Sequence, residues 1–127
     1  MKNISSLISL SKKNLSVCPW CSVKPSLEYF KFLKDEIVEL EEALKKDDLD
    51  NIEEELGDVL WVTLTLILIC EREKKVQSEM LVDRILKKFI GRKPWLLTNE
   101  KVTSDEAVKI WNEAKKKEKE AKLSKNK

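Results

Sequence analysis

Between Pro25 and Pro94 the chain contains no proline and only two glycines, Gly57 and Gly91. These two residue types are the least favourable in a helix interior, so a long stretch nearly free of them favours long helices. Of the 127 residues, 42% are apolar and 38% are charged, a mixture typical of soluble amphipathic helices. Because a chain of this length has room for one core, we expect a single all-α domain.

Apolar residues recur at helical spacing through the middle of the chain. They predict a helix from Pro25 to about Lys46, whose apolar stripe consists of Tyr29, Leu33, Ile37, Leu40 and Leu44. Asp47 and Asp48 can end this helix and cap the next, which runs from about Leu49 to Lys74. Its predicted buried face carries Leu49, Ile52, Leu56, Val59, Leu60, Thr63 and Ile67. From Val59 to Cys70 this helix is apolar on every side, so it should be the most buried of all.

The remaining segments complete an antiparallel bundle of four core helices preceded by a short N-terminal helix. The short helix carries Leu7 and ends near Asn14, and the fourth helix covers about 77–92 and stops at Pro94. Residues 95–102 are predicted to be a loop, and the sequence from Thr103 to Glu106 has the form of a capping box that begins the last helix. We assign residues 1–120 to one domain and expect the lysine-rich end, 121–127, to fray.

Charge and cysteine content exclude several classes of protein. A net charge of +2 does not favour nucleic-acid binding, and the apolar run of about 12 residues from Val59 is too short to cross a membrane. The absence of an apolar leader near Met1 and the low, odd cysteine count favour a cytoplasmic location. Cys18 and Cys21 have CxxC spacing, but zinc needs about four ligands and the chain has no histidine, which favours two ordinary thiols.

Two pairs of carboxylates mark the edges of the central helices. Glu36 and Glu39 lie about 60° and 120° from the apolar stripe of their helix, on one flank. Glu55 and Asp58 lie about 100° and 160° from the Leu56 stripe, again on one flank. If the helices pack antiparallel, the pairs can meet, and the repulsion among four acids then requires protons or cations. An all-oxygen site suits magnesium or manganese, although the spacing alone fits ordinary solvated acids about as well.

Five segments together resemble the MazG-type nucleotide pyrophosphohydrolases of the all-α NTP pyrophosphatase superfamily. Residues 34–40 and 54–60 are similar to the EExxE…ExxD signature of that family. Residues 7–20 resemble its N-terminal segment, which ends in CPWD. Residues 88–97 resemble its KxIRRHPHVF segment, and residues 104–115 resemble its closing EVxxxWExxK helix. The likeness covers about residues 5–120 in the same order. The chain departs from the family pattern at Asp35, Cys21, Lys24, Pro25, Gly91, Lys93 and Trp95, while the four acids are intact.

The resemblance implies magnesium-dependent hydrolysis of a nucleoside triphosphate to a monophosphate and pyrophosphate, for nucleotide pool control or house-cleaning. It assigns metal binding and catalysis to Glu36, Glu39, Glu55 and Asp58, with Mg²⁺ as the cofactor and Mn²⁺ as a possible substitute. Water attacks the α-phosphorus, so no side-chain nucleophile is needed. The resemblance and the all-round apolar helix also imply a homodimer or a dimer of dimers, centred on the third helix or its neighbours, where Trp61, Thr65 and Leu68 lie away from the main stripe.

The resemblance also supplies candidate substrate-binding residues: Arg84, Lys88 and Arg92 for the phosphates, and Trp20 and Trp111 for the base. The three cations share one helix face at i, i+4 and i+8, which fits a solvated face as well, and both tryptophans fit core packing equally well. Two other functions stay open. One is a sister all-α pyrophosphatase that acts on dUTP, dCTP or phosphoribosyl-ATP, and the other is a helical binding module that has lost catalysis.

Overall fold

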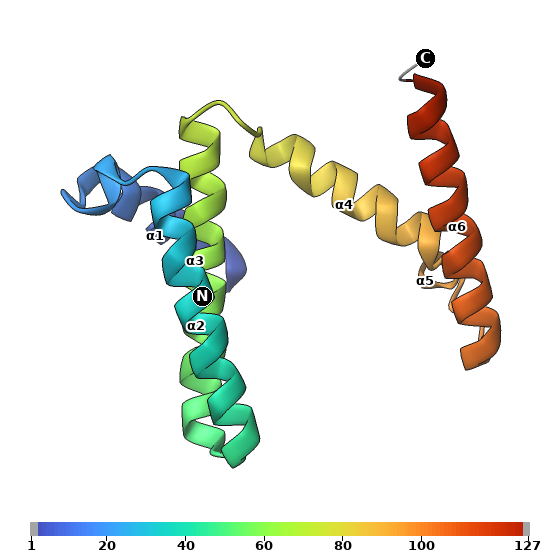
Figure 1. The fold of residues 1–127 in the computed structure, drawn as a ribbon, viewed down its shortest axis with the longest axis horizontal. Coiled ribbons are helices and arrows are strands. Elements are labelled where there is room, and N and C mark those ends of the chain that lie inside the picture. The colour runs from blue at the N-terminus through green and yellow to red at the C-terminus, as the bar shows by residue number, and fades with distance from the viewer. Residues whose placement is uncertain (1–2, 126–127) are drawn as a thin grey trace. The chain divides into compact units, whose positions relative to one another are not determined.

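The computed structural model describes residues 3–125, and every regular element in that part of the chain is helical (Figure 1). The elements are α1 (Ile4–Val17), the 3-10 helix η1 (Cys21–Val23), α2 (Ser26–Lys46), α3 (Leu49–Arg72), α4 (Ser78–Arg92), α5 (Trp95–Thr98) and α6 (Ser104–Lys125). These elements form two compact units, Met1–Ser78 and Glu79–Lys127. The all-α prediction is confirmed, whereas the assignment of 1–120 to one domain stays a prediction.

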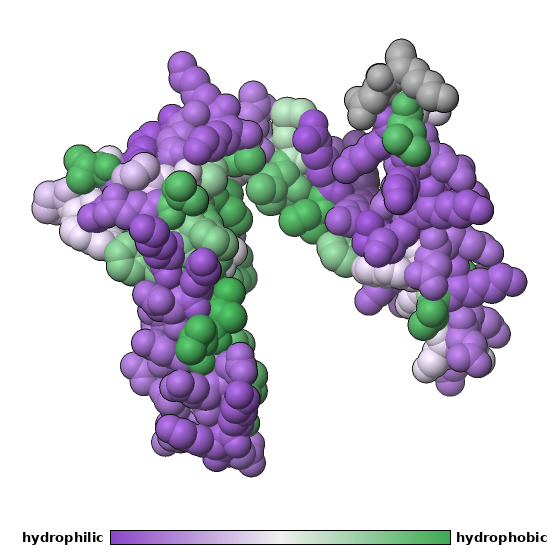
Figure 2. Space-filling model, in the orientation of Figure 1, coloured by the Kyte–Doolittle hydropathy of each residue, from purple (hydrophilic) through white to green (hydrophobic). Residues whose placement is uncertain are grey.

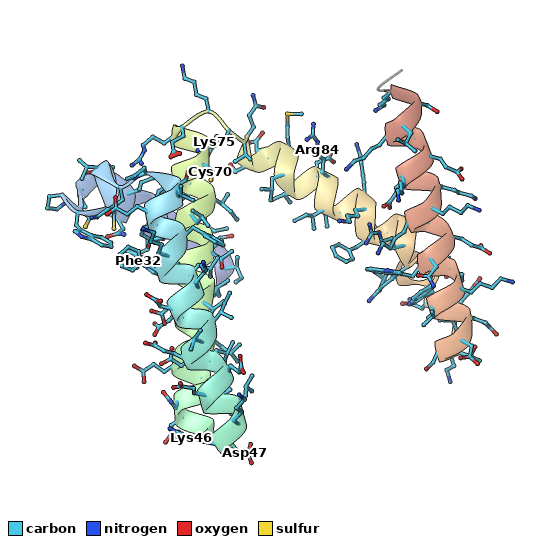
Figure 3. The ribbon with its side chains drawn as sticks, viewed as in Figure 1. Phe32, Lys46, Asp47, Cys70, Lys75 and Arg84 are labelled. Atoms are coloured by element: carbon cyan, nitrogen blue, oxygen red, sulfur yellow. The ribbon has the colours of Figure 1, made fainter. Side chains whose placement is uncertain are left out.

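Helices α2 and α3 form an antiparallel hairpin in the first unit, with Asp47 at its turn (Figure 3). Asp47 ends α2 with a left-handed φ of 51°. The Asp48 side chain then caps α3 by accepting a hydrogen bond from the backbone N–H of Asn51 at 3.4 Å. The break predicted at the two aspartates is therefore confirmed, because short polar side chains suit both the left-handed region and a helix N-cap.

The inner faces of this hairpin consist of residues spaced by seven, which places them about two helical turns apart on the same side. They are Tyr29, Glu36 and Ala43 on α2, and Glu55, Val62 and Ile69 on α3.

The predicted buried face of α3 is wrong. Leu56 and Leu60 are 52% and 40% exposed, while Leu68, expected on the far side, is only 9% exposed. Figure 2 shows apolar side chains along an exposed edge of the hairpin. Periodicity could not choose the face because this helix is apolar on every side.

The core of the first unit lies between the hairpin, α1 and η1. Its buried members are Cys21, Tyr29, Val62 and Ile69, against which Leu15, Cys18, Phe32, Leu33, Trp61 and Leu66 pack. Helix α1 contacts α3 through a buried polar pair, in which the hydroxyl oxygens of Ser11 and Thr65 lie 3.3 Å apart. Helix α1 continues to Val17, past the end predicted near Asn14, and Asn3 caps its start by accepting from the backbone N–H of Ser6 at 3.1 Å.

The C-terminal end of α3 is tied to the segment that leads into α2. The Arg72 guanidinium donates to the carbonyl oxygens of Ser22, at 2.7 Å, and Lys24. Glu73 accepts from both the backbone N–H of Ser26, at 2.8 Å, and its hydroxyl, at 2.6 Å. Because Pro25 precedes α2 and supplies no side-chain cap, Glu73, at the C-terminus of α3, satisfies the N-terminus of α2 at the open end of the hairpin.

The second unit begins with α4 and ends with α6. Pro94 follows the end of α4 as predicted, but residues 95–98, expected to be loop, form α5, which Asn99 ends with a φ of 57°. The capping box begins α6 through a bond from the Glu106 N–H to the Thr103 hydroxyl at 3.2 Å. Helix α6 continues to Lys125 through the segment expected to fray, since lysine, glutamate and alanine are strong helix formers. No helix in the described part is long and apolar enough to span a membrane.

Candidate active site

Three carboxylates from the two helices of the hairpin converge. Glu36 and Glu39 come from α2 and Glu55 comes from α3, and one oxygen of each lies within 4.8 Å of the others. The antiparallel turn at Asp47 brings these two helix segments to the same level of the hairpin. The structure therefore brings together three of the four acids that the sequence predicts as metal ligands.

The position of these acids in the packing differs from the prediction. Glu36 and Glu55 lie on the inner faces of the hairpin, not along their edges, and Glu55 is only 9% exposed. In the part of the chain that the structure describes, the Oε2 atoms of both residues are buried without a hydrogen-bond partner. An unsatisfied carboxylate oxygen is unfavourable in a helix interface unless a proton or a cation reaches it.

Electrostatics in the cluster favour protonation. Burial, followed by the negative charge of Glu39 and a hydrogen bond with Glu55, raises the pKa of Glu36 to about 7. Burial and Glu39 also raise the pKa of Glu55. Two ionised carboxylates have no donor between them, so Glu36 and Glu55 share a hydrogen bond only when one is protonated. Asp58, half-buried on α3, adds to the negative potential that raises both pKa values.

The donor set fits a hard divalent cation. All the candidate ligand atoms are carboxylate oxygens, which Mg²⁺ and Mn²⁺ prefer, and the orphaned Oε2 atoms leave lone pairs available. A cation would offset the charge repulsion that, after burial, raises the pKa values of Glu36 and Glu55. The cluster is therefore chemically suited to hold magnesium.

Trp20 lies in the first unit, beside the loop that joins α1 to α2. Its ring is 46% exposed and packs edge-on against Phe32 at a centroid distance of 5.0 Å. The Lys24 ammonium lies 4.8 Å from the ring centroid. A half-exposed aromatic ring fixed on one side by a neighbouring ring could stack on a base with its open surface.

Arg92 and Trp111 meet in the second unit. The guanidinium lies 4.7 Å from the indole centroid and donates from Nη2 to Glu118 at 2.8 Å, with a further bond from Nε at 3.3 Å. Phe89 packs against the same indole at a centroid distance of 5.9 Å. The structure thus joins two predicted substrate-binding residues through a cation–π contact and adds an acid, Glu118, that the sequence did not indicate.

Arg84 and Lys88 are exposed on α4, about two helical turns and one helical turn before Arg92, respectively. Their i, i+4, i+8 spacing on a helix is confirmed, so the three cations lie along one face. The Glu118 carboxylate has a lowered pKa mainly because of its bond with Arg92, and Lys88 contributes through its charge.

No local signal marks Glu118 or Glu73 in the sequence. Glu118 pairs with a residue on a different helix, and Glu73 caps a helix that begins far earlier in the chain. Both are single glutamates in charged segments, where the partner follows from the tertiary structure alone.

Comparisons with known proteins place the chain in one family. Residues 25–97 match the MazG nucleotide pyrophosphohydrolase domain. The chain is 30% identical over 117 residues to the nucleoside triphosphate pyrophosphohydrolase of Mycolicibacterium smegmatis and 26% identical over 114 residues to that of Mycobacterium tuberculosis. The matches cover 91% and 88% of this chain but only 36% and 35% of those relatives, so the chain spans about a third of their length.

One solved structure matches this chain over nearly the whole length of the solved protein. The crystal structure of a mazG-related protein from Thermotoga maritima aligns with a TM-score of 0.84 and 35% sequence identity, covering 89% of this chain and 99% of that one. The family match covers more than half of the chain and contains all four predicted metal ligands. The chain belongs to the MazG nucleotide pyrophosphohydrolase domain family.

Proposed function

We propose that this protein hydrolyses nucleoside triphosphates to a nucleoside monophosphate and pyrophosphate at the cluster of Glu36, Glu39, Glu55 and Asp58. The observation that carries the proposal is the convergence of three of these carboxylates within 4.8 Å in a domain of the MazG family. The names of the mycobacterial relatives, both nucleoside triphosphate pyrophosphohydrolases, support the same substrate class.

The four acids would hold Mg²⁺, which Mn²⁺ could replace. When bound there, the ion supplies charge stabilisation for the triphosphate and lowers the pKa of a water molecule that attacks the α-phosphorus. The buried Oε2 atoms of Glu36 and Glu55 have no hydrogen-bond partner in the described part of the chain, so they are available to the ion.

Each unit carries its own candidate substrate-binding residues. Arg84, Lys88 and Arg92 would bind the phosphates through charge-assisted hydrogen bonds. Trp20 and Trp111 would stack on the base, each supported on one side by another aromatic ring. Cleavage by water needs no side-chain nucleophile, so the reaction leaves no covalent intermediate on the protein.

We also propose that the protein is a homodimer, which could pair further. The support is the apolar surface left on the hairpin, which includes Ile37, Leu44, Leu49, Leu56 and Leu60, all at least 40% exposed. At about 100° per residue, Leu56 and Leu60 lie about 120° and 160° around α3 from Val62, which packs inside the hairpin. A two-fold pairing would cover this surface with the same surface of a second copy. The interface expected around Trp61 and Leu68 therefore moves by about 80–140° around the helix.

The test is pyrophosphate release from a panel of canonical and modified NTPs and dNTPs with Mg²⁺. The expected products are the monophosphate and pyrophosphate. The Glu55→Gln variant should be inactive, while the matched Glu53→Gln variant, at an exposed position on the same helix, should keep wild-type turnover. Orthophosphate and a diphosphate as the primary products would contradict the proposal, as would equal activity in the two variants.

A further inference from the structure

The loop between α1 and α2 carries two cysteines in an asymmetric arrangement. Cys18 caps the C-terminus of α1 and is half-buried, while Cys21 begins η1 and is only 6% exposed. The backbone nitrogen of Cys21 donates to the Sγ atom of Cys18 at 3.5 Å. A hydrogen bond from the Asn14 side chain reaches the Cys21 sulfur, also at 3.5 Å. Both sulfurs thus have fixed positions on one turn of the chain.

The two thiols differ in the way that disulfide exchange requires. Hydrogen bonds from the backbone of Cys21 and Trp20 lower the pKa of Cys18, and the Cys21 thiol adds to the effect. Burial raises the pKa of Cys21. A thiolate is the attacking species in exchange, so the more exposed and more acidic sulfur attacks first and the buried sulfur resolves.

We propose that Cys18 and Cys21 form a redox-active dithiol that low-molecular-weight disulfides oxidise, with Cys18 as the attacking residue and Cys21 as the resolving residue. The chemistry belongs to the first unit alone and does not depend on the hydrolase activity proposed above.

The exchange balances in two steps. The Cys18 thiolate attacks one sulfur of the small disulfide, forms a mixed disulfide and releases one small thiolate, which takes up a proton. Cys21 then loses its proton and attacks the Cys18 sulfur, which forms the Cys18–Cys21 bond and releases the second small thiol. The protein loses two electrons and two protons, and the small disulfide is reduced to two thiols.

Alternative roles for the pair lack the partners that they need. A structural zinc site takes about four ligands, the chain has no histidine, and the third cysteine, Cys70, lies on α3 outside the core cluster that contains Cys18 and Cys21. Two inert core thiols would both be buried, whereas Cys18 keeps part of its surface accessible.

The experiment exposes the full chain to buffers of oxidised and reduced glutathione, quenches with acid, alkylates the free thiols and measures the intact mass. We expect the wild-type mass to equal that of the reduced chain minus two hydrogens plus one alkyl group, which Cys70 carries. The Cys21→Ser variant should trap one glutathione on Cys18, and the Cys18→Ser variant should form an adduct on Cys21 at least about tenfold more slowly. Cys70→Ser is the matched control and should oxidise like the wild type.

Three results would overturn the proposal. The first is full alkylation of both cysteines in the wild-type protein at every glutathione ratio, and the second is faster adduct formation on Cys21 than on Cys18. The third is protection of both thiols by added zinc with no disulfide formed, which would identify a metal site. The wild-type measurement needs no variant, so a folding defect in one substitution leaves the test intact.

Discussion

Glu36 and Glu55 face one another across the α2–α3 hairpin, with a carboxylate oxygen of each within 4.8 Å of the other. Glu36 lies seven residues after Tyr29 on the inner face of α2, and Glu55 lies fourteen residues before Ile69 on the inner face of α3. The packing of two helices thus includes two acids at a place where apolar contact would stabilise the fold more.

Substitution of either acid by its amide should separate function from stability. We expect Glu36→Gln and Glu55→Gln to lower turnover by at least about a hundredfold, because each removes a proposed metal ligand. Glu39→Gln and Asp58→Asn should do the same. The melting temperature of the metal-free variants should match or exceed that of the wild type, because repulsion is relieved. Steady-state kinetics and thermal melts in EDTA measure both effects, and wild-type turnover in any of the four would remove that residue from the site.

The stability of the metal-free protein should fall as the pH rises from about 4.5 to 7. The pKa of Glu36 is about 7 in the folded chain against an ordinary value of 4.5, so the folded state holds a proton that the unfolded state has released. Stability is therefore greatest below this window and is lost through it. Denaturant titrations across that pH range would measure the slope, which Glu36→Gln should reduce. Saturating Mg²⁺ should also reduce it, because the ion replaces the proton.

The contribution of Glu73 to stability should change with pH in the opposite direction, and at lower pH. Its hydrogen bonds with Ser26 and its ion pair with Lys75 lower its pKa to about 2. This contribution to stability is present above the ordinary value of 4.5 and is lost as the pH falls towards 2. Glu73→Gln should lower the melting temperature at neutral pH by a few degrees, whereas Glu41→Gln, which breaks an exposed pair with Lys45, should leave it nearly unchanged. Equal shifts in the two variants would contradict the capping role.

Substitutions of Arg92 and of Glu118 should change KM in opposite directions. Arg92→Gln is expected to raise KM about tenfold, because a charge-assisted hydrogen bond to phosphate is lost. Glu118→Gln should lower KM, since the carboxylate competes with phosphate for the same guanidinium. The control is Lys87→Gln, which removes an exposed lysine of α4 paired with Asp83. If both variants raise KM, Glu118 instead holds Arg92 in its binding geometry.

Charge placed on the exposed face of α3 should disrupt assembly. Leu56→Glu and Leu60→Glu are expected to shift the protein from dimer to monomer in light scattering at low micromolar concentration, because a dimer interface would bury the new carboxylates without partners. Leu97→Glu, at a position 70% exposed in the second unit, is the control. A wild-type protein that is active at the mass of one chain, 14.8 kDa, would refute the dimer.

Features encoded by neighbouring residues could be predicted from the sequence. The break at Asp47 and Asp48, the stop before Pro94 and the cap at Thr103 each depend on a few adjacent side chains and are all present. The acids of the candidate site were found because their three-residue spacing and their surroundings resemble one family. Their convergence follows from the antiparallel hairpin that the aspartate break allows.

Features that depend on which surfaces meet could not be predicted. Helix α3 offers apolar residues in every direction, so its pattern did not reveal that Val62 and Ile69 face inward while Leu56 faces outward. The pairing of Arg92 with Glu118 joins two helices, and periodicity within either helix carries no information about it.

The ties at the two ends of the hairpin have a consequence for ion selectivity. One end is closed by the turn at Asp47, and the other is tied by hydrogen bonds of Arg72 and Glu73 with residues 22–26, so both ends of the helix pair are held. These ties would fix the spacing of the carboxylates between the helices before an ion binds. A preorganised, inflexible cage suits Mg²⁺, with oxygen distances of about 2.0–2.1 Å, better than Ca²⁺, which needs about 2.3–2.6 Å and more ligands. The hydrogen bonds of Glu73 would thus help to discriminate between ions at a site that Glu73 never touches.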